Sequence, residues 1–270
     1  MTSDPVEVTD DSKTVTVRKD EYGKGVITIE ISRPENRNAL NDQVRSELRT
    51  AVTAVDDSDA RVVVLTGDGS GGAFVAGADI QDFRNRDVNE QRRAGDSPRV
   101  YEAIADLNQP AIARINGHAL GGGCELTLAC DIRIAVRDAK IGLPEITLGL
   151  MPGGGATQRL PRIVGDGKAR ELIFTGEPIT TTEAARIGLV NDVVPADELD
   201  DRVADVAGTM AEHSAIALRF AKRACNVAYS TPLDEGVEHE RELFHGLFAT
   251  GEKNEGIDAF FEDRDPEWEW

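Results

Sequence analysis

Two glutamates have sequence neighbours that favour burial. Glu125 follows three glycines and precedes apolar residues, and Glu145 lies within Gly142–Ile146 among glycine and apolar residues. Most of the chain's 49 Asp and Glu residues must lie at the surface, so these neighbours set the two apart. Two buried carboxylates close together push their pKa values apart, which leaves one as a proton donor and the other as a base. The pair therefore predicts acid–base chemistry.

A glycine-rich segment runs from Asn116 to Glu125 and includes Gly121, Gly122 and Gly123. Glycines between a strand and a helix let the backbone approach a ligand and direct N–H groups at it. The alternative is a loop whose glycines only allow a strand and a helix to pack. The segment lacks the Gly-Lys-Ser/Thr of a phosphate-binding loop and the GxGxxG spacing of a dinucleotide-binding motif.

A second segment of small residues, Phe74–Ile80, could direct another backbone N–H group into a site. The alternative is an ordinary turn from strand to helix in which Asp79 caps the helix. His118 and Cys124 lie inside the first glycine-rich segment. Because the sequence has no GxSxG motif and no evident third residue to orient the histidine, both are predicted to be structural.

The composition of the 270-residue chain excludes several functions. It has 30 Lys and Arg residues against 49 Asp and Glu residues, a formal net charge of −19. Such a surface repels phosphate backbones and anionic membranes, which argues against nucleic-acid and membrane binding. An anionic ligand must then rely on local arginines, lysines and backbone N–H groups. The acids are spread along the chain and indicate a solvated acidic shell of the kind that halophilic proteins carry.

The three cysteines, Cys124, Cys130 and Cys225, form no CxxC pair. This argues against a disulfide scaffold and a cysteine-rich zinc site, and it is typical of the cytoplasm. The segment Met1–Ser12 has no apolar core of a signal peptide, and no run approaches the roughly 20 apolar residues of a membrane span. A cytoplasmic protein is expected.

The elements that must position these residues alternate between strands and helices. Runs at Thr14–Arg18 and Gly25–Ser32 predict a hairpin, and the apolar spacing from Val44 to Val55 predicts a helix capped by Asn41 or Asp42. The charged segment 84–98 lacks periodicity and is expected to be exposed. Further strands and short helices are predicted at Val62–Leu65, Pro98–Leu107 (helix), Ala111–Ile115, Cys124–Cys130 (helix) and Ile132–Val136. This alternation predicts an α/β fold with layered sheets.

After about residue 195 the sequence shows only helical patterns. These are Asp197–Tyr229, Leu233–Phe248 and Glu252–Phe261. The pattern predicts an α/β core over residues 1–197, which holds the site, and a helical C-terminal region over residues 198–270.

Together these segments resemble the crotonase superfamily of enoyl-CoA hydratases and isomerases over nearly the whole chain, and the hydratases most of all. The matching blocks agree in order and spacing; they are Arg33–Leu40, Ala76–Ile80, Asn116–Glu125, Ala129–Asp131, Pro144–Gly149, Met151–Leu160 and Ala184–Val190. The resemblance implies a crotonase-type spiral of repeated ββα units, not a Rossmann sheet, with a C-terminal helical region.

The resemblance also implies roles for single residues. The backbone N–H groups of Ala78 and Gly122 form an oxyanion hole for the thioester carbonyl as it becomes an enolate. Glu125 activates the water that attacks C3, and Glu145 gives a proton to C2. Isomerases and several other branches lack one of the two acids. The presence of both therefore favours reversible hydration of trans-2-enoyl-CoA to 3-hydroxyacyl-CoA, with fatty-acid β-oxidation as the expected setting.

The substrate and the partners follow from the same resemblance. The CoA side of the pocket is expected to be lined by Arg37, Ala39, Ala76, Asp79 and Ile80. Lys222 or Lys253 could reach a CoA phosphate. No cofactor and no metal are expected, since CoA is part of the substrate. The C-terminal region is expected to form a homotrimer or a dimer of trimers.

Other activities remain open at this point. Within the superfamily they are an isomerase, an acyl-CoA hydrolase and a dehydratase for branched acyl groups. Outside catalysis they are a non-catalytic acyl-CoA binder and an RNA-binding relative. The acidic charge argues against RNA, and retention of both glutamates argues against a non-catalytic protein.

Overall fold

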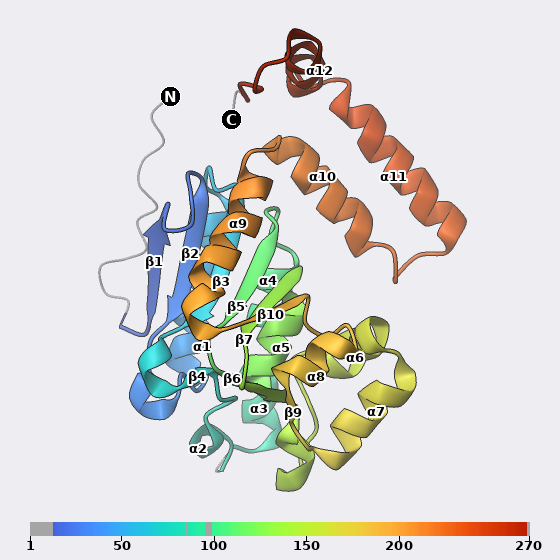
Figure 1. Cartoon of the computed structure of the whole chain (residues 1–270). Helices are drawn as coiled ribbons and strands as arrows, with labels where there is room; N and C mark the ends of the chain where they lie inside the picture. Colours follow the sequence, from blue (N-terminus) through green and yellow to red (C-terminus); the bar gives the residue numbers. More distant parts are fainter. Residues whose placement is uncertain (1–12, 85, 95–98, 269–270) are drawn as a thin grey trace.

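The computed structural model describes residues 13–84, 86–94 and 99–268 (Figure 1). Its strands form two sheets. The larger has the order β1-β2-β3-β5-β7-β10, with β1 (Val15–Lys19), β2 (Val26–Ile31), β3 (Val62–Gly67), β5 (Ala111–Ile115), β7 (Ile132–Val136) and β10 (Asp192–Val194). The smaller has the order β4-β6-β8-β9, with β4 (Ala73–Val75), β6 (His118–Leu120), β8 (Lys140–Gly142) and β9 (Ile179–Thr180).

The chain winds between these sheets as a spiral. β3, β5 and β7 lie side by side and parallel in the larger sheet, and β4, β6 and β8, which follow them in sequence, lie side by side and parallel in the smaller one. Each turn thus adds one strand to each sheet before helices intervene. β1 and β2 form the predicted antiparallel hairpin, in which Val15 pairs with Ile31. The predicted ββα spiral is confirmed.

Helices cover the sheets and form the C-terminal part of the chain. The helices before residue 195 are α1 (Asp42–Asp56), α2 (Ile80–Phe83), α3 (Val88–Ala94), α4 (Val100–Ala105), α5 (Gly122–Ala129), α6 (Ala156–Val164), α7 (Asp166–Thr175) and α8 (Thr181–Arg186). The later helices are α9 (Leu199–Ala211), α10 (Ala215–Asn226), α11 (Leu233–Leu247) and α12 (Glu252–Glu262). Short 3-10 helices lie at η1 (Pro34–Asn36), η2 (Gly69–Gly71), η3 (Pro144–Leu148) and η4 (Ala196–Glu198).

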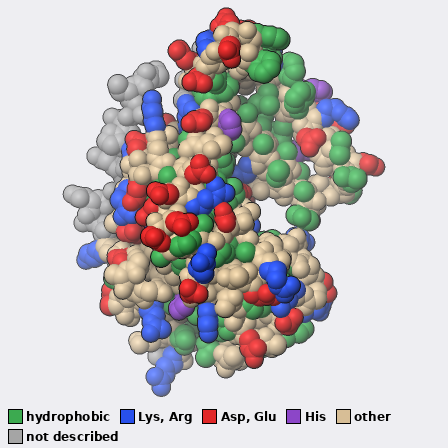
Figure 2. Space-filling model, viewed as in Figure 1, with side chains coloured by type: hydrophobic (Ala, Val, Ile, Leu, Met, Phe, Trp, Pro, Cys, Tyr) green, Lys and Arg blue, Asp and Glu red, His purple; other side chains and the backbone are tan. Residues whose placement is uncertain are grey.

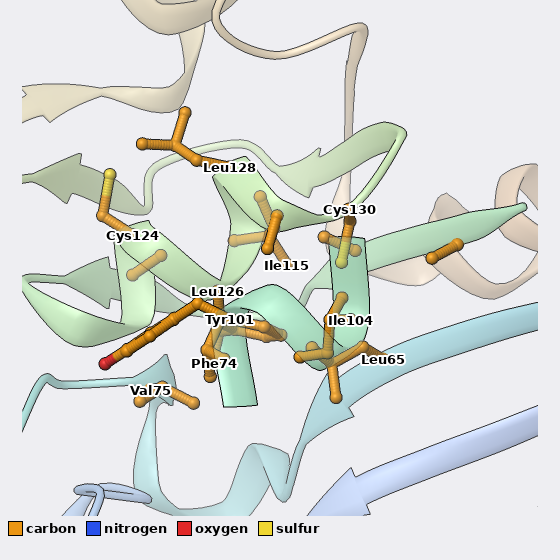
Figure 3. Close-up of a cluster of buried hydrophobic side chains, with 14 of the residues drawn as sticks. Leu65, Phe74, Val75, Tyr101, Ile104, Ile115, Cys124, Leu126, Leu128 and Cys130 are labelled. Atoms are coloured by element: carbon orange, nitrogen blue, oxygen red, sulfur yellow. The ribbon is translucent and has the colours of Figure 1, made fainter. Parts of the chain in front are cut away.

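Alternation along β3 divides the core between the two faces of the larger sheet. Val63 and Leu65 face a cluster that includes α1, α4 and α5, whereas Val62 and Val64 face a second cluster with α9. Successive strand residues point to opposite faces, so one strand supplies both clusters. Figure 3 shows part of the first cluster, where Tyr101 from α4 lies among Phe74, Val75 and Leu126 with its hydroxyl at the edge.

The segment 84–98 is exposed over most of its described residues, as expected, and it contains α3. Two other predictions about the elements need correction. The helix expected over Pro98–Leu107 is α4, Val100–Ala105, and Pro98 lies outside the described residues. The pattern Asp197–Tyr229 is two helices, because Ser214 accepts a hydrogen bond from the Ala217 N–H at 3.0 Å and starts α10 afresh. Apolar periodicity continued across that break and concealed it.

The C-terminal helices differ in how they contact the body. α9 packs on the larger sheet, whereas α10, α11 and α12 extend from it (Figure 1). The buried Lys222 ties α10 down: its Nζ lies 2.8 Å from Oδ2 of the exposed Asp131 and donates to the Gln109 carbonyl at 2.9 Å. No described helix is long and apolar enough to cross a membrane. The division at residue 197 stays a prediction.

Candidate active site

Glu125 and Glu145 line one cavity of about 660 Å³, together with Ala78, Gly122 and Tyr101. Glu125 comes from the first turn of α5, which begins directly after Gly121. Glu145 comes from η3, whose second residue it is. The two acids are 20 residues apart in sequence but act on each other electrostatically, since the charge of Glu125 raises the pKa of Glu145. The structure therefore brings together the pair that the sequence singled out.

Glu125 is fixed by hydrogen bonds to one of its oxygens. Its Oε1 accepts the Gly154 N–H at 2.6 Å and the Ala156 N–H at 3.1 Å. The side chain is 3% exposed, and burial raises its pKa even though these N–H groups lower it. A Cβ at Gly154 would lie 2.7 Å from the other oxygen, Oε2. The backbone at Gly154 and Ala156 thus holds the Glu125 carboxylate, and the absence of a side chain at Gly154 leaves room for it.

Glu145 has a different environment. Its Oε2 is buried and accepts no hydrogen bond from any described residue. Burial, and then the nearby charge of Glu125, raise the pKa of Glu145 to about 7. Gly121, at φ 52°, approaches this side chain closely, since a Cβ there would lie 3.1 Å from Oε1. A carboxyl group with this pKa can hold a proton and release it near neutral pH.

Two backbone N–H groups are aimed into the same cavity. Leu40 pairs with the segment around Ala78: its N–H donates to the Gly77 carbonyl at 2.8 Å, and its carbonyl accepts the Asp79 N–H at 3.0 Å. Because adjacent residues of an extended segment point to opposite sides, the N–H of Ala78 faces away from Leu40. Gly122 is the first residue of α5, so its N–H has no partner within the helix. A Cβ on Gly122 would lie 3.6 Å from the Ala78 nitrogen.

The loop that supplies Ala78 is held by a side chain that the sequence analysis missed. Asn38 is fully buried, and its Nδ2 donates to the carbonyls of Ala73 at 2.9 Å and Phe74 at 3.1 Å. This ties the segment before Leu40 to β4. One asparagine in a polar run gives no signal of burial, so only the fold reveals this role.

Tyr101 was also missed. It is 8% exposed and fills the space between two glycines, since a Cβ at Gly122 would lie 2.8 Å from its hydroxyl oxygen and a Cβ at Gly154 would lie 2.5 Å from its ring. Burial, followed by the charge of Glu125, raises the pKa of Tyr101, so the hydroxyl stays protonated. No sequence motif marks this residue.

The residues expected on the CoA side lie together, but not in this cavity. Arg37 accepts the Ala76 N–H with its carbonyl at 3.0 Å, and Ala39 accepts Arg33 Nη1 with its carbonyl at 2.8 Å. Asp79 caps α2 and lies 3.4 Å from Arg33 Nη1, and Ile80 is 57% exposed. All five therefore belong to the two paired segments around Leu40 and Ala78. None of them is among the residues that line the cavity of Glu125 and Glu145.

The remaining candidates lie elsewhere. Lys222 is buried and paired with Asp131, so this chain does not present it to the cavity. Lys253 lies on α12 over the Phe248 ring, 4.9 Å from its centroid. His118 accepts the Lys140 N–H at 3.0 Å, and burial raises the pKa of the Cys124 thiol, in line with structural roles for both. Among the described residues, no group of three or more His, Cys, Asp and Glu side chains could hold a metal ion.

This arrangement defines a class of protein. Two N–H groups can stabilise a developing oxyanion, and the buried carboxyl group of Glu125 and the half-buried one of Glu145 can move protons on neighbouring atoms. The molecule is built as an enzyme for acid–base chemistry next to a carbonyl group. Comparison with known proteins gives the family.

A family model described as enoyl-CoA hydratase/isomerase matches residues 21–270. The chain is 44% identical over 257 residues to a probable enoyl-CoA hydratase of Mycobacterium bovis, which covers 95% of this chain and 98% of the relative. It is 44% identical over 236 residues to a crotonyl-CoA hydratase of Syntrophomonas wolfei, with 87% and 90% covered. The crystal structure of an enoyl-CoA hydratase from Bacillus anthracis gives a TM-score of 0.90 at 39% identity, with 95% and 99% covered. The chain belongs to the enoyl-CoA hydratase/isomerase family.

Proposed function

We propose that this protein is an enoyl-CoA hydratase, which adds water reversibly to a trans-2-enoyl-CoA and gives a 3-hydroxyacyl-CoA. The observation that carries the proposal is the pair of glutamates, Glu125 buried and Glu145 half-buried, that lines one cavity with the two inward-facing N–H groups. The named relatives at 44% identity support the same activity. Hydration of crotonyl-CoA, followed by loss of the enoyl-thioester absorbance, is the direct test. Fatty-acid β-oxidation and a cytoplasmic location stay predictions.

The mechanism follows from the four groups. The N–H groups of Ala78 and Gly122 bind the thioester oxygen and stabilise the negative charge that it gains as an enolate, at about 3 kcal/mol for each donor. Glu125, oriented by the Gly154 and Ala156 N–H groups, takes a proton from water as the water oxygen bonds to C3. Glu145 gives its proton to C2. Water and two carboxyl groups supply every atom, so the reaction as proposed needs no cofactor.

The pH dependence follows from the shared proton. Hydration needs Glu125 ionised and Glu145 protonated, and dehydration needs the reverse, so both directions use a pair that carries one proton. With the pKa of Glu145 at about 7, kcat/KM is expected to fall about tenfold per pH unit above that value as the proton is lost. The net reaction takes up no proton, so the profiles for crotonyl-CoA and 3-hydroxybutyryl-CoA should coincide. A flat profile from pH 6 to 9 would contradict the assignment of Glu145.

The C-terminal helices are proposed to join three copies of the chain, or two such trimers. No residue of α11 is buried in the single chain, and Phe244 and Phe248 on its side, with Phe260 and Phe261 of α12, are 56–80% exposed. Figure 2 shows hydrophobic side chains gathered over this part of the molecule. Exposed apolar surface of this extent marks an interaction site.

We expect a mass in solution of three or six times 29.1 kDa by light scattering. The double substitution Phe260→Asp and Phe261→Asp is expected to lower it. A monomeric wild-type protein would refute this assembly without touching the assignment of the active site.

A further inference from the structure

Glu125 depends on a loop N–H group whose direction no helix or strand fixes. Gly154 and Ala156 donate to its Oε1 at 2.6 and 3.1 Å. Ala156 is the first residue of α6, whereas Gly154 belongs to neither a helix nor a strand. Another contact must therefore hold the Gly154 N–H against Glu125, and the mechanism above does not include one.

Arg99 supplies that contact. It directly precedes α4, and its Nη1 donates to the Gly153 carbonyl at 2.7 Å. The Gly153 C=O and the Gly154 N–H belong to one planar peptide unit, and in the trans form they point in opposite directions. No peptide bond among the described residues is cis. A guanidinium group that holds the carbonyl oxygen therefore also directs the N–H, so one peptide unit connects Arg99 to Glu125.

The charge of Arg99 acts in the same direction. A cation at the carbonyl oxygen polarises the peptide unit, and hydrogen bonds in series strengthen one another. Burial raises the pKa of Glu125, and the charge of Arg99 is one of the causes that lower it. Both effects favour the ionised carboxylate, which is the form that takes a proton from water.

Arg159, from α6, holds the next peptide unit of the loop. Its Nη1 donates to the Gly154 carbonyl at 3.0 Å, and its charge also lowers the pKa of Glu125 against the effect of burial. The N–H of that unit belongs to Gly155, however, and is not one of the two that donate to Glu125. Arg159 thus acts on Glu125 by its charge, whereas Arg99 acts by its charge and through a bonded N–H group.

The other titratable groups that face Glu125 come from three elements. Burial raises the pKa of the Tyr101 hydroxyl, from α4, and of the Cys124 thiol, from α5, so both stay protonated. Glu145, from η3, is the acid of the pair, and burial raises its pKa to about 7. The two arginines are therefore the cations that offset the burial of Glu125.

We propose that Arg99 is a positioning residue for hydration, which directs the Gly154 N–H at Glu125 through the peptide unit and so holds that carboxylate in the orientation of a base. This rests on the proposed hydratase function. Arg99 also lines the cavity, so the alternative is that it binds an anionic group of the substrate. The two roles differ in kinetics, because positioning of the base changes kcat, whereas binding away from the reacting atoms changes KM.

Arg99→Gln is expected to lower kcat for crotonyl-CoA hydration about tenfold, the low end for loss of a hydrogen bond to a charged group, and to change KM less than about threefold. Burial then raises the pKa of Glu125 with less opposition. Because Glu125 must be ionised, the acid limb of the kcat/KM profile should move to higher pH, whereas the alkaline limb set by Glu145 should move less. Arg99→Lys, which keeps the charge, should return the acid limb toward its wild-type position.

Arg162→Gln is the matched control. Arg162 is an exposed arginine of α6 that donates to the Gln158 carbonyl at 2.6 Å, and it does not line the cavity. The substitution removes the same charge and the same kind of hydrogen bond, and it should leave kcat, KM and the pH profile unchanged. Arg99→Gln should also cause no further loss when added to Glu125→Gln, since the base on which it acts is then absent.

Each of three results would overturn the inference: a rise in KM with kcat unchanged, a loss of kcat with an unmoved acid limb, or an equal loss in the Glu125→Gln background. If wild type does not hydrate crotonyl-CoA, the proposed function fails, but the effect of Arg99 on Glu125 can still be measured. Carbon-13 NMR of protein labelled at glutamate Cδ, with Glu125→Gln to identify the signal, gives the pKa of Glu125. A pKa that Arg99→Gln does not raise contradicts the inference.

Discussion

Glu125→Gln and Glu145→Gln are each expected to lower kcat for crotonyl-CoA hydration about 100- to 10,000-fold, the range that a positioned acid or base contributes. Glutamine keeps the size of the side chain, and its carbonyl oxygen at position 125 can still accept the Gly154 and Ala156 N–H groups. Its amide group can neither take a proton from water nor give one to C2. The rate of loss of the enoyl-thioester absorbance measures both effects.

The double variant distinguishes a working pair from two separate contributions. If the two carboxyl groups share one proton, loss of either disables the pair, so Glu125→Gln/Glu145→Gln should be little slower than the slower single variant. Glu171→Gln is the matched control, because Glu171 is exposed on α7 and its carboxylate forms a surface salt bridge with Lys168. A single variant at either position that keeps more than a tenth of wild-type activity would refute that residue's role.

Stability provides a further check on the same variants. Burial raises the folded-state pKa of both glutamates, so the folded protein binds their protons more tightly than the unfolded chain does. This stabilisation of the protonated form is lost as the pH rises, and ionised glutamate then costs the fold free energy. Above pH 7 the glutamine variants should melt at or above the wild-type temperature. Loss of activity with unchanged or greater stability separates catalysis from folding.

The two acids could be predicted from the sequence because each has an unusual local environment. Glycine and apolar neighbours around Glu125 and Glu145 indicated burial, and the resemblance to the crotonase superfamily implied the spiral. The hairpin and the layered α/β fold followed from alternation, whereas the parallel pairing of the strands was seen only in the structure. These patterns lie within short segments of the chain, so they can be recognised without knowledge of the fold.

The residues that the sequence analysis missed act through distant contacts. Tyr101 comes from a short helix and meets Gly122 and Gly154 only after folding. Asn38 donates hydrogen bonds to carbonyl groups of β4, which lies more than 30 residues away in sequence. Five arginines of the cavity lining are spread between residues 45 and 99, and each alone resembles a solvated surface charge. The assignment of Arg37, Ala39, Ala76, Asp79 and Ile80 to the CoA side stays a prediction; the fold brings these residues together outside the lining of the cavity that holds the acids.

The break between α9 and α10 shows the limit of periodicity. Apolar residues continue at helical spacing from Leu199 to Phe220, yet the chain turns at His213 and Ser214. Serine is a common N-cap, so the signal was present at a single position. A single capping residue within a periodic run is weak evidence for a break between two helices until the contacts of both helices are known.

Gly122→Ala is expected to lower kcat/KM about 100- to 1,000-fold, the effect of losing one oxyanion-hole donor. The new methyl group would lie 3.6 Å from the Ala78 nitrogen and 2.8 Å from the Tyr101 hydroxyl. An oxyanion must approach both N–H groups to about 3 Å, so the methyl group occupies its place. Adding Tyr101→Phe removes the closer contact, because the hydroxyl oxygen is the atom that clashes.

The double variant Gly122→Ala/Tyr101→Phe should therefore regain wild-type stability without regaining activity. Gly167→Ala is the matched control, since a Cβ at Gly167 meets nothing within 4 Å and the residue lies in α7. There alanine should raise stability slightly, by up to about 1 kcal/mol, and leave kcat/KM unchanged. If Gly122→Ala hydrates crotonyl-CoA at the wild-type rate, the thioester oxygen does not bind between Ala78 and Gly122. The two glutamates would then act on a carbonyl held elsewhere in the cavity.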